Sequence, residues 1–225
     1  VEKNTPKNGT ILDMAAGTGE VTIPLLKKKY RVSSLDIHRG MLKELRRKAG
    51  KENLKNHTVI LKDMNLLTKR NKFDTVCIRQ AINYYKNPKS LERGLRKVFS
   101  ALKDTGSFVF NAPNFRVGTK NFKTVHTLYE YKNLKAFVVE TNVLKKRVLV
   151  HNQDTIVWNS IVNSNPRFVS DSNSFYMYTK EEFERALVHA GFHDIRFFSS
   201  NRTLNLLCHT HFLSHYERKL ELQPR

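Results

Sequence analysis

The chain of 225 residues has little cysteine, no long apolar run and few acidic residues. Its two cysteines, Cys77 and Cys208, lie far apart without a C-x-x-C spacing, so the sequence indicates neither a disulfide framework nor a cysteine zinc site. No apolar stretch approaches the ~20 residues that a membrane span requires, and residues 1–6 contain no apolar signal segment. We therefore expect a cytoplasmic protein without a membrane span.

Acidic residues are outnumbered two to one, because 20 Asp and Glu face 40 Lys and Arg, giving a formal net charge of +20. The excess lies in residues 1–150, with 32 basic and 12 acidic residues, whereas residues 151–225 hold eight of each. A charge of this size makes a nucleic-acid partner possible. Solvent-exposed helix faces would account for the same charges, so both explanations stay open.

Several common ligand motifs are absent from the sequence. There is no Gly-x-x-x-x-Gly-Lys-Ser/Thr loop to hold a nucleoside triphosphate, and the nine histidines show no metal-binding spacing, so we expect no metal. The dinucleotide fingerprint Gly-x-Gly-x-x-Gly would require glycine at position 22, where Thr22 stands. These absences weigh against nucleotide hydrolysis, a metal centre and dinucleotide binding.

Strand-like and helix-like segments alternate over the first hundred residues. Apolar runs predict strands at Thr10–Met14, Arg31–Ile37, Thr58–Asp63, Phe73–Ile78 and Ser107–Phe110. Apolar residues at helical spacing predict helices that begin near Val21, include residues 41–49 and include residues 91–102. This alternation predicts a parallel sheet with helices on both faces.

The pattern changes after the fifth predicted strand. Residues 124–158 resemble three antiparallel strands, with turns near residues 132–133 and 145–146. Thr179 and Glu182 form a capping-box pattern that predicts a helix over Lys180–Ala190, closed by Gly191. Residues 192–199 and 203–212 then predict a strand pair.

We therefore expect a single α/β domain, 1–225. Its doubly wound, mostly parallel seven-stranded sheet would have helices on both faces and an antiparallel strand insertion as a lid. Residues 10–114 would form a cofactor-binding core, residues 115–178 the lid, and residues 179–212 the closing helix and strands.

Acidic residues end, or nearly end, the first three predicted strands. Asp13 precedes a run of small residues that reaches Gly19, Asp36 closes the second strand, and Asp63 with Met64 closes the third. In a doubly wound sheet, ligands bind beyond the carboxyl ends of the strands. Small residues let the backbone approach a ligand, and Asp36 could accept both hydroxyls of a ribose. Asp63 beside Met64 would suit the amino group and ring of an adenine.

From Thr10 to Asn114 the chain resembles the class I, Rossmann-like S-adenosylmethionine-dependent methyltransferases, and the predicted strands of residues 124–158 are similar to the strand insertions of members of small-molecule type. The likeness centres on residues 11–20, Ile-Leu-Asp-Met-Ala-Ala-Gly-Thr-Gly-Glu, where Ala15 stands in place of a glycine that many members have. The resemblance implies S-adenosylmethionine as cofactor and S-adenosylhomocysteine as product. It also implies these cofactor-binding residues: Asp13, Ala15, Gly17, Thr18, Gly19, Asp36, Ile37, Met41, Asp63, Met64 and Arg79.

The resemblance further implies methyl transfer to a nitrogen or oxygen atom of a small molecule by in-line displacement, a reaction that depends mainly on positioning. Candidate substrate contacts are Asn83, Tyr84, Asn114, His126 and Tyr176. Tyr84 could equally pack a helix and His126 could be an ordinary strand residue, and we assign no catalytic base. The alternatives are an RNA or protein methyltransferase that docks its partner on the basic face, and a non-catalytic S-adenosylmethionine-binding subunit.

Overall fold

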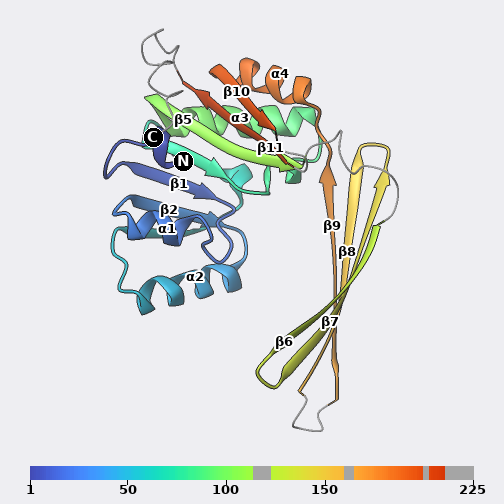
Figure 1. Ribbon diagram of the computed structural model, residues 1–225. Helices are drawn as coiled ribbons and strands as arrows, with labels where there is room; N and C mark the ends of the chain where they lie inside the picture. Colours follow the sequence, from blue (N-terminus) through green and yellow to red (C-terminus); the bar gives the residue numbers. More distant parts are fainter. Residues whose placement is uncertain (114–122, 160–164, 200–202, 211–225) are drawn as a thin grey trace. The chain divides into compact units, whose positions relative to one another are not determined.

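The computed structural model describes residues 1–113, 123–159, 165–199 and 203–210. The chain divides into two compact units (Figure 1). The larger unit consists of Val1–Asn114 and Thr179–Arg225, and the smaller unit consists of Phe115–Tyr178.

The larger unit contains a seven-stranded sheet in the order β10-β11-β5-β4-β1-β2-β3. Its strands are β1 (Thr10–Met14), β2 (Arg31–Asp36), β3 (His57–Leu61), β4 (Phe73–Ile78), β5 (Leu102–Pro113), β10 (His193–Ser199) and β11 (Thr203–His209). Strands β1 to β5 are parallel, while β11 is antiparallel to both β5 and β10. The predicted mostly parallel sheet is confirmed, and the carboxyl ends of β1 to β5 meet at one edge.

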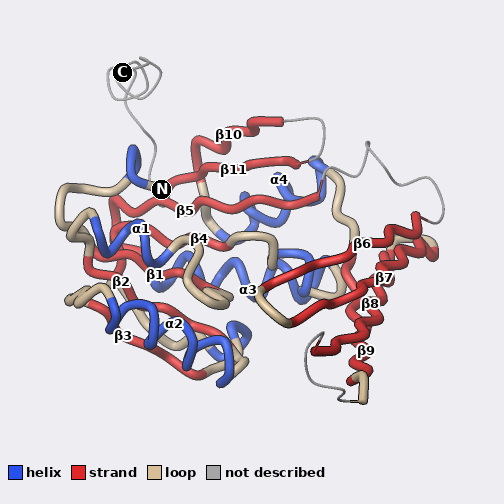
Figure 2. Tube along the Cα trace, turned by 60° about the horizontal axis from the view of Figure 1, so that its bottom comes forward, coloured by secondary structure: helices blue, strands red, loops and turns tan. Residues whose placement is uncertain are grey.

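Helices cover both faces of this sheet, as the alternating pattern predicted. They are α1 (Thr22–Lys27), α2 (Arg39–Lys51), α3 (Pro88–Ala101) and α4 (Lys180–Ala190), with 3-10 turns η1 (Glu2–Asn4), η2 (Met64–Leu66) and η3 (Ile82–Tyr84). Figure 2 shows α1 and α2 on one face and α3 and α4 on the other. Leu25 and Leu26 of α1 pack with Ile11 and Val32 on the first face. On the second face, the rings of Phe108 and Phe192 stack with centroids 5.7 Å apart.

The ends of α3 and α4 follow from their capping residues. Asn87 and Ser90 form a capping box at the start of α3, and Thr179 and Glu182 form the predicted capping box of α4. Gly191 ends α4 in the left-handed conformation, with a φ of 103°, which glycine adopts without steric cost.

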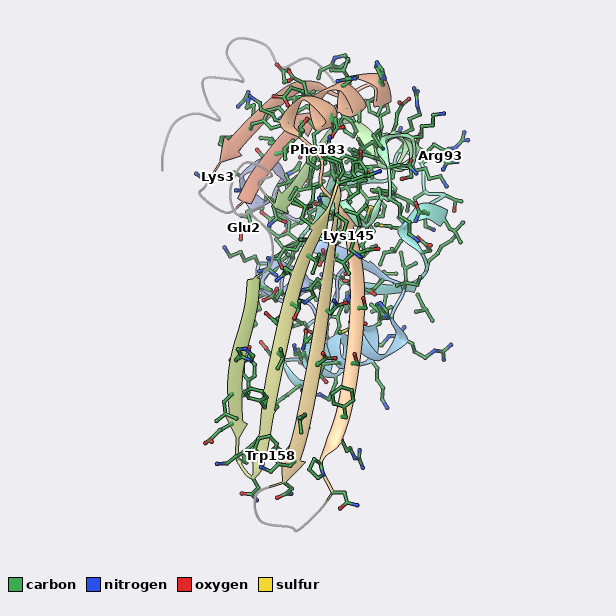
Figure 3. The ribbon with its side chains drawn as sticks, turned by 90° about the vertical axis from the view of Figure 1, so that its right-hand side faces the viewer. Glu2, Lys3, Arg93, Lys145, Trp158 and Phe183 are labelled. Carbon is green, nitrogen blue, oxygen red and sulfur yellow. The ribbon has the colours of Figure 1, made fainter. Side chains whose placement is uncertain are left out.

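The smaller unit is a four-stranded antiparallel sheet in the order β6-β7-β8-β9. Its strands are β6 (Lys123–Tyr131), β7 (Leu134–Lys145), β8 (Val148–Asn159) and β9 (Arg167–Tyr176), and Figure 3 shows them side by side. The sequence predicted three strands and missed β9. Residues 170–174 of that strand are polar, and its edge position leaves most of its side chains exposed, so no alternating apolar pattern marks it.

One face of the smaller sheet carries an apolar row. Leu128, Phe137, Ile156 and Phe168 are partners in register across the four strands, and their side chains stay between 36% and 66% exposed. The described part of the chain contains no helix long and apolar enough to cross a membrane.

Candidate functional site

The predicted cofactor-binding residues lie at the carboxyl edge of the larger sheet. Strands β4, β1, β2 and β3 are neighbours in that order, so the loops that follow them meet. The connections leave in opposite directions on the two sides of β1, which makes this edge the switch point where ligands bind in doubly wound sheets.

The loop after β1 bends through three left-handed residues, namely Ala15, Gly17 and Gly19, with φ angles of 57°, 53° and 92°. A Cβ atom added at Gly19 would collide with the side chain of Leu45, so this glycine lets α2 pack closely. A Cβ atom at Gly17 would have no neighbour within 4 Å. The backbone at Gly17 therefore borders open space that a ligand could enter. The neighbouring Thr18 carbonyl accepts a hydrogen bond of 3.2 Å from Lys48 Nζ.

Asp13 lies beneath this loop and is only 1% exposed. Its Oδ2 accepts a 2.7 Å hydrogen bond from Thr22 Oγ1, and its Oδ1 accepts a weak one from Cys77 Sγ. Burial raises the pKa of the Asp13 carboxyl to about 6, although the hydrogen bonds from Thr22 and Cys77 act in the opposite direction. The structure thus places Asp13 where it ties β1 to α1, and its predicted direct contact with a cofactor stays a prediction.

Asp36 ends β2 and joins two loops of the site. Its Oδ2 accepts a hydrogen bond from the Gly17 amide and its Oδ1 accepts one from the His38 amide, both at 2.8 Å. The side chain is nearly buried, with Asp36 6% exposed. Each carboxylate oxygen can accept two hydrogen bonds, so each keeps one acceptor position for a ligand hydroxyl.

Asp63 lies two residues beyond the end of β3, which stops at Leu61 rather than at Asp63 as predicted. The strand pairing of β3 ends at Leu61. Asp63 caps η2 by accepting hydrogen bonds from Asn65 N at 2.7 Å and Asn65 Nδ2 at 2.9 Å. Met64 follows in η2 and is half-buried.

Two large apolar side chains near Asp36 remain exposed. Ile37 directly follows β2 and is 58% exposed, and Met41 in the first turn of α2 is 47% exposed. Exposed apolar groups beside carboxylates are suited to the flat face of a heterocyclic ring. The adenine-binding role that the resemblance implies for them stays a prediction.

Arg79 follows β4 and forms an ion pair with Glu20, which follows Gly19 in the β1 loop. The pair joins two loops at the site, and the Arg79 side chain stays 43% exposed. Glu20 was not predicted from the sequence as a residue of this edge. The only signal was its charge next to the small-residue loop, and nothing in the sequence links it to Arg79.

The predicted substrate residues belong to both units. Asn83 and Tyr84 lie together in η3 after β4; Asn83 is 2% exposed and Tyr84 is 43% exposed. His126 and Tyr176 belong to the smaller unit, where His126 stacks on Phe137 with ring centroids 5.9 Å apart. Tyr176 contacts Tyr178, with centroids 4.7 Å apart. Asn114 lies outside the described residues.

The chain is similar to known methyltransferases. A family model described as a methyltransferase domain matches residues 6–191. The chain is 26% identical to the putative methyltransferase YqeM of Bacillus subtilis (strain 168) over 187 residues, which cover 82% of this chain and 67% of YqeM. It is 30% identical to the ubiquinone/menaquinone biosynthesis C-methyltransferase UbiE of Wigglesworthia glossinidia brevipalpis over 136 residues. That match covers 57% of this chain and 52% of UbiE, so the chain spans about half the length of this relative.

A solved structure shares the fold. The sugar N-methyltransferase KedS8 from Streptoalloteichus sp. ATCC 53650 superimposes with a TM-score of 0.79 at 20% identity. The match covers 92% of this chain and 82% of KedS8. It therefore includes the larger part of both units.

Proposed function

The chain belongs to the family of methyltransferase domains and is a class I S-adenosylmethionine-dependent methyltransferase. We propose that it methylates a nitrogen or oxygen atom of a small molecule. The observation that supports cofactor binding most directly is the hydrogen bond from the Gly17 amide to the Asp36 carboxylate at the switch point. There a carboxylate with spare acceptor positions lies beside a backbone that borders open space.

The residues at this edge fit S-adenosylmethionine by their chemistry. Asp36 would accept the two ribose hydroxyls, and Ile37 and Met41 would cover the adenine ring. Asp63 and the Met64 amide would meet the adenine edge. The loop of Ala15, Gly17, Thr18 and Gly19 would leave room for the methionine end, which a guanidinium such as that of Arg79 can bind through its carboxylate.

Asp13 would act on the cofactor through the loop. Its side chain is enclosed by Thr22 and Cys77, so we assign it the role of a positioning residue that fixes the start of α1. When bound, S-adenosylmethionine supplies a methyl group made electrophilic by the sulfonium. The chain must then orient the acceptor and exclude water.

A nitrogen acceptor suits this site better than a hydroxyl. A neutral amine attacks without help, whereas a hydroxyl needs a base within hydrogen-bond reach, and we assign no base. Asn83 and Tyr84 in η3, which begins three residues after Arg79, would position the acceptor. We also propose that Asn114, His126 and Tyr176 contribute to substrate binding, with residues 115–178 as the segment that selects the substrate.

The similar proteins support a small acceptor. KedS8 is described as a sugar N-methyltransferase, and UbiE as an enzyme of ubiquinone and menaquinone biosynthesis. The buried free thiols of Cys77 and Cys208 are compatible with the cytoplasmic location that we propose.

One observation favours a second candidate, a methyltransferase that docks RNA on its basic face. Helix α2 carries six basic residues, Arg39, Lys43, Arg46, Arg47, Lys48 and Lys51. Its single acidic residue, Glu44, is already paired with Arg47 at 2.7 Å. The exposed side of α2 is therefore strongly positive, which suits phosphate contacts.

Transfer of labelled methyl groups from S-adenosylmethionine distinguishes the two candidates. Acceptor pools of amino sugars, phenols and RNA are compared at physiological salt, with Asp36→Ala as the variant and Asp74→Asn, at the opposite end of the strands, as the matched control. We expect label in the amine pool that Asp36→Ala loses and Asp74→Asn keeps. Label confined to RNA, reduced by Lys43→Glu and Arg46→Glu, would contradict the small-molecule proposal and support the second candidate.

A further inference from the structure

A cavity of about 290 Å³ lies between η2 and α3, apart from the loop of Gly17. Asn65 lines it from η2, and Ser90, Arg93, Gly94 and Lys97 line it from α3. The four α3 residues are spaced i, i+3, i+4 and i+7, so they share one face of the helix. Neither proposed role of this chain uses this cavity.

The wall of the cavity is fixed by close packing. Gly94 lies against the ring of Tyr85, and a Cβ atom added at Gly94 would collide with that ring. Tyr85 is only 1% exposed, and burial, together with the Asp63 charge, raises the pKa of its phenol. At the start of α3, Ser90 Oγ donates a 2.8 Å hydrogen bond to the Asn87 carbonyl. The packing of Gly94 on Tyr85 and the capping hydrogen bond of Ser90 therefore both fix the position of this helix face.

The charged side chains that line the cavity are all positive. Arg93 and Lys97 are the charged residues that line it, and both are basic. Lys97 Nζ donates to the Asn65 carbonyl, which leaves two of its three N–H donors available. Arg93 is exposed and pairs with no acidic side chain of the described residues.

The single acidic residue of α3 does not neutralise these cations. Glu92 is already paired with Arg96 at a distance of 2.8 Å. The carboxylate of Asp63, which is close in sequence, accepts both hydrogen bonds of the Asn65 side chain and amide. The cavity therefore combines excess positive charge with unused donors.

We propose that this cavity binds the phosphate group of a small anionic ligand, either free phosphate or a phosphate ester. Arginine presents a planar fork of donors that matches a tetrahedral oxyanion, and lysine adds a compact positive charge. A volume of about 290 Å³ is near the lower end for ligand sites, about 300 Å³, so a phosphate group with a short substituent fits. Such a site lies beside the adenine end of the proposed cofactor site and is separate from it.

The test is an NMR titration of the full chain at constant ionic strength with sodium phosphate, glycerol 3-phosphate or sodium chloride. S-adenosylhomocysteine is added to saturation, so that an anion cannot occupy the position of the methionine carboxylate. We expect saturable shifts of the Asn65, Gly94 and Lys97 amide signals with at least one phosphate compound and none with chloride. Tighter binding of the ester would identify a phosphorylated metabolite, and tighter binding of phosphate would identify the free ion.

Matched variants complete the test. Arg93→Gln and Lys97→Gln should each weaken the phosphate affinity by about fivefold or more, while Arg96→Gln, which removes the paired arginine outside the cavity, should not. Equal shifts with chloride, or equal loss with Arg96→Gln, would overturn the proposal. Because saturation with S-adenosylhomocysteine rests on the proposed function, the titration is repeated without it. A failure of that cofactor to bind appears in its own titration and leaves the phosphate result intact.

Discussion

Asp13 carries a carboxylate that the fold encloses almost completely, and its pKa rises from 3.8 to about 6 because of burial. The folded protein therefore keeps this proton to a higher pH than the unfolded chain does. Between about pH 4 and pH 6 the folded state binds more protons, so the contribution of Asp13 to the free energy of unfolding decreases as the pH rises. Two pKa units correspond to about 3 kcal/mol.

We predict that Asp13→Asn removes this pH dependence. The free energy of unfolding of the wild type, relative to the variant, should fall by about 3 kcal/mol as the pH rises from below 4 to 7. Urea unfolding of both proteins over a series of pH values measures this difference. A difference that stays constant with pH would show that the carboxyl is not held in its neutral form by the fold.

Ala15 adopts a left-handed conformation with a φ of 57°, which costs an L-residue about 1 kcal/mol. Ala15→Gly should therefore raise the free energy of unfolding by about 0.5 kcal/mol, after the greater entropy of glycine in the unfolded chain is subtracted. The control is Ala16→Gly, because Ala16 has no positive φ, and this change should lower the free energy of unfolding. Thermal unfolding of both variants checks the prediction, and equal destabilisation by the two would contradict it.

Part of the site could be predicted residue by residue. Asp36 and Gly17 do meet at the carboxyl edge, because the alternating sequence pattern predicts parallel strands, whose carboxyl ends lie at the same edge of the sheet. The partners of these residues could not be predicted. Glu20 and Arg79 are far apart in sequence, and an ion pair between two loops leaves no periodic signal.

At the scale of elements, the contact between Gly94 of α3 and Tyr85 predicts an unusual effect of alanine in a helix. Alanine normally stabilises a helix relative to glycine by about 1 kcal/mol. At position 94 its Cβ would collide with the Tyr85 ring, and overpacking costs about 1–3 kcal/mol. Gly94→Ala should therefore destabilise the protein by up to about 2 kcal/mol in urea unfolding, which is the overpacking cost less the gain in helix propensity.

Two controls separate packing from propensity. Gly50→Ala in α2, where a Cβ would have no neighbour within 4 Å, should stabilise the protein. Gly94→Ala in a Tyr85→Leu background should be neutral or stabilising, because the ring is gone. If the double variant loses as much stability as the sum of the single changes, the collision is not the cause.

Helices and strands could be predicted where the sequence shows a buried apolar run or a capping motif. Strand β1 has the predicted bounds because buried parallel strands are continuous apolar runs, and α4 begins at a recognisable capping box. Strand β9 was missed because a polar edge strand is stabilised by its hydrogen bonds to β8 rather than by an apolar face.

At the scale of the whole molecule, the sequence predicts the class of fold and the location of the charge. The net charge of +20 belongs to the first two thirds of the chain, and α2 concentrates part of it next to the loop of Asp36. Composition alone could not decide whether this surface holds a partner, because a solvated helix has the same residues.

Titration of S-adenosylhomocysteine by calorimetry tests the central claim, that Asp36 and the Gly17 loop form the cofactor site. Asp36→Ala should weaken the affinity by about 1–3 kcal/mol, or roughly 5- to 150-fold, because ligand hydroxyls and backbone amides lose their acceptor. Asp74→Asn, at the amino end of β4 where the side chain bonds Thr10 and Lys103, should leave it unchanged. Affinity retained within twofold by Asp36→Ala, or lost equally by both variants, would contradict the account.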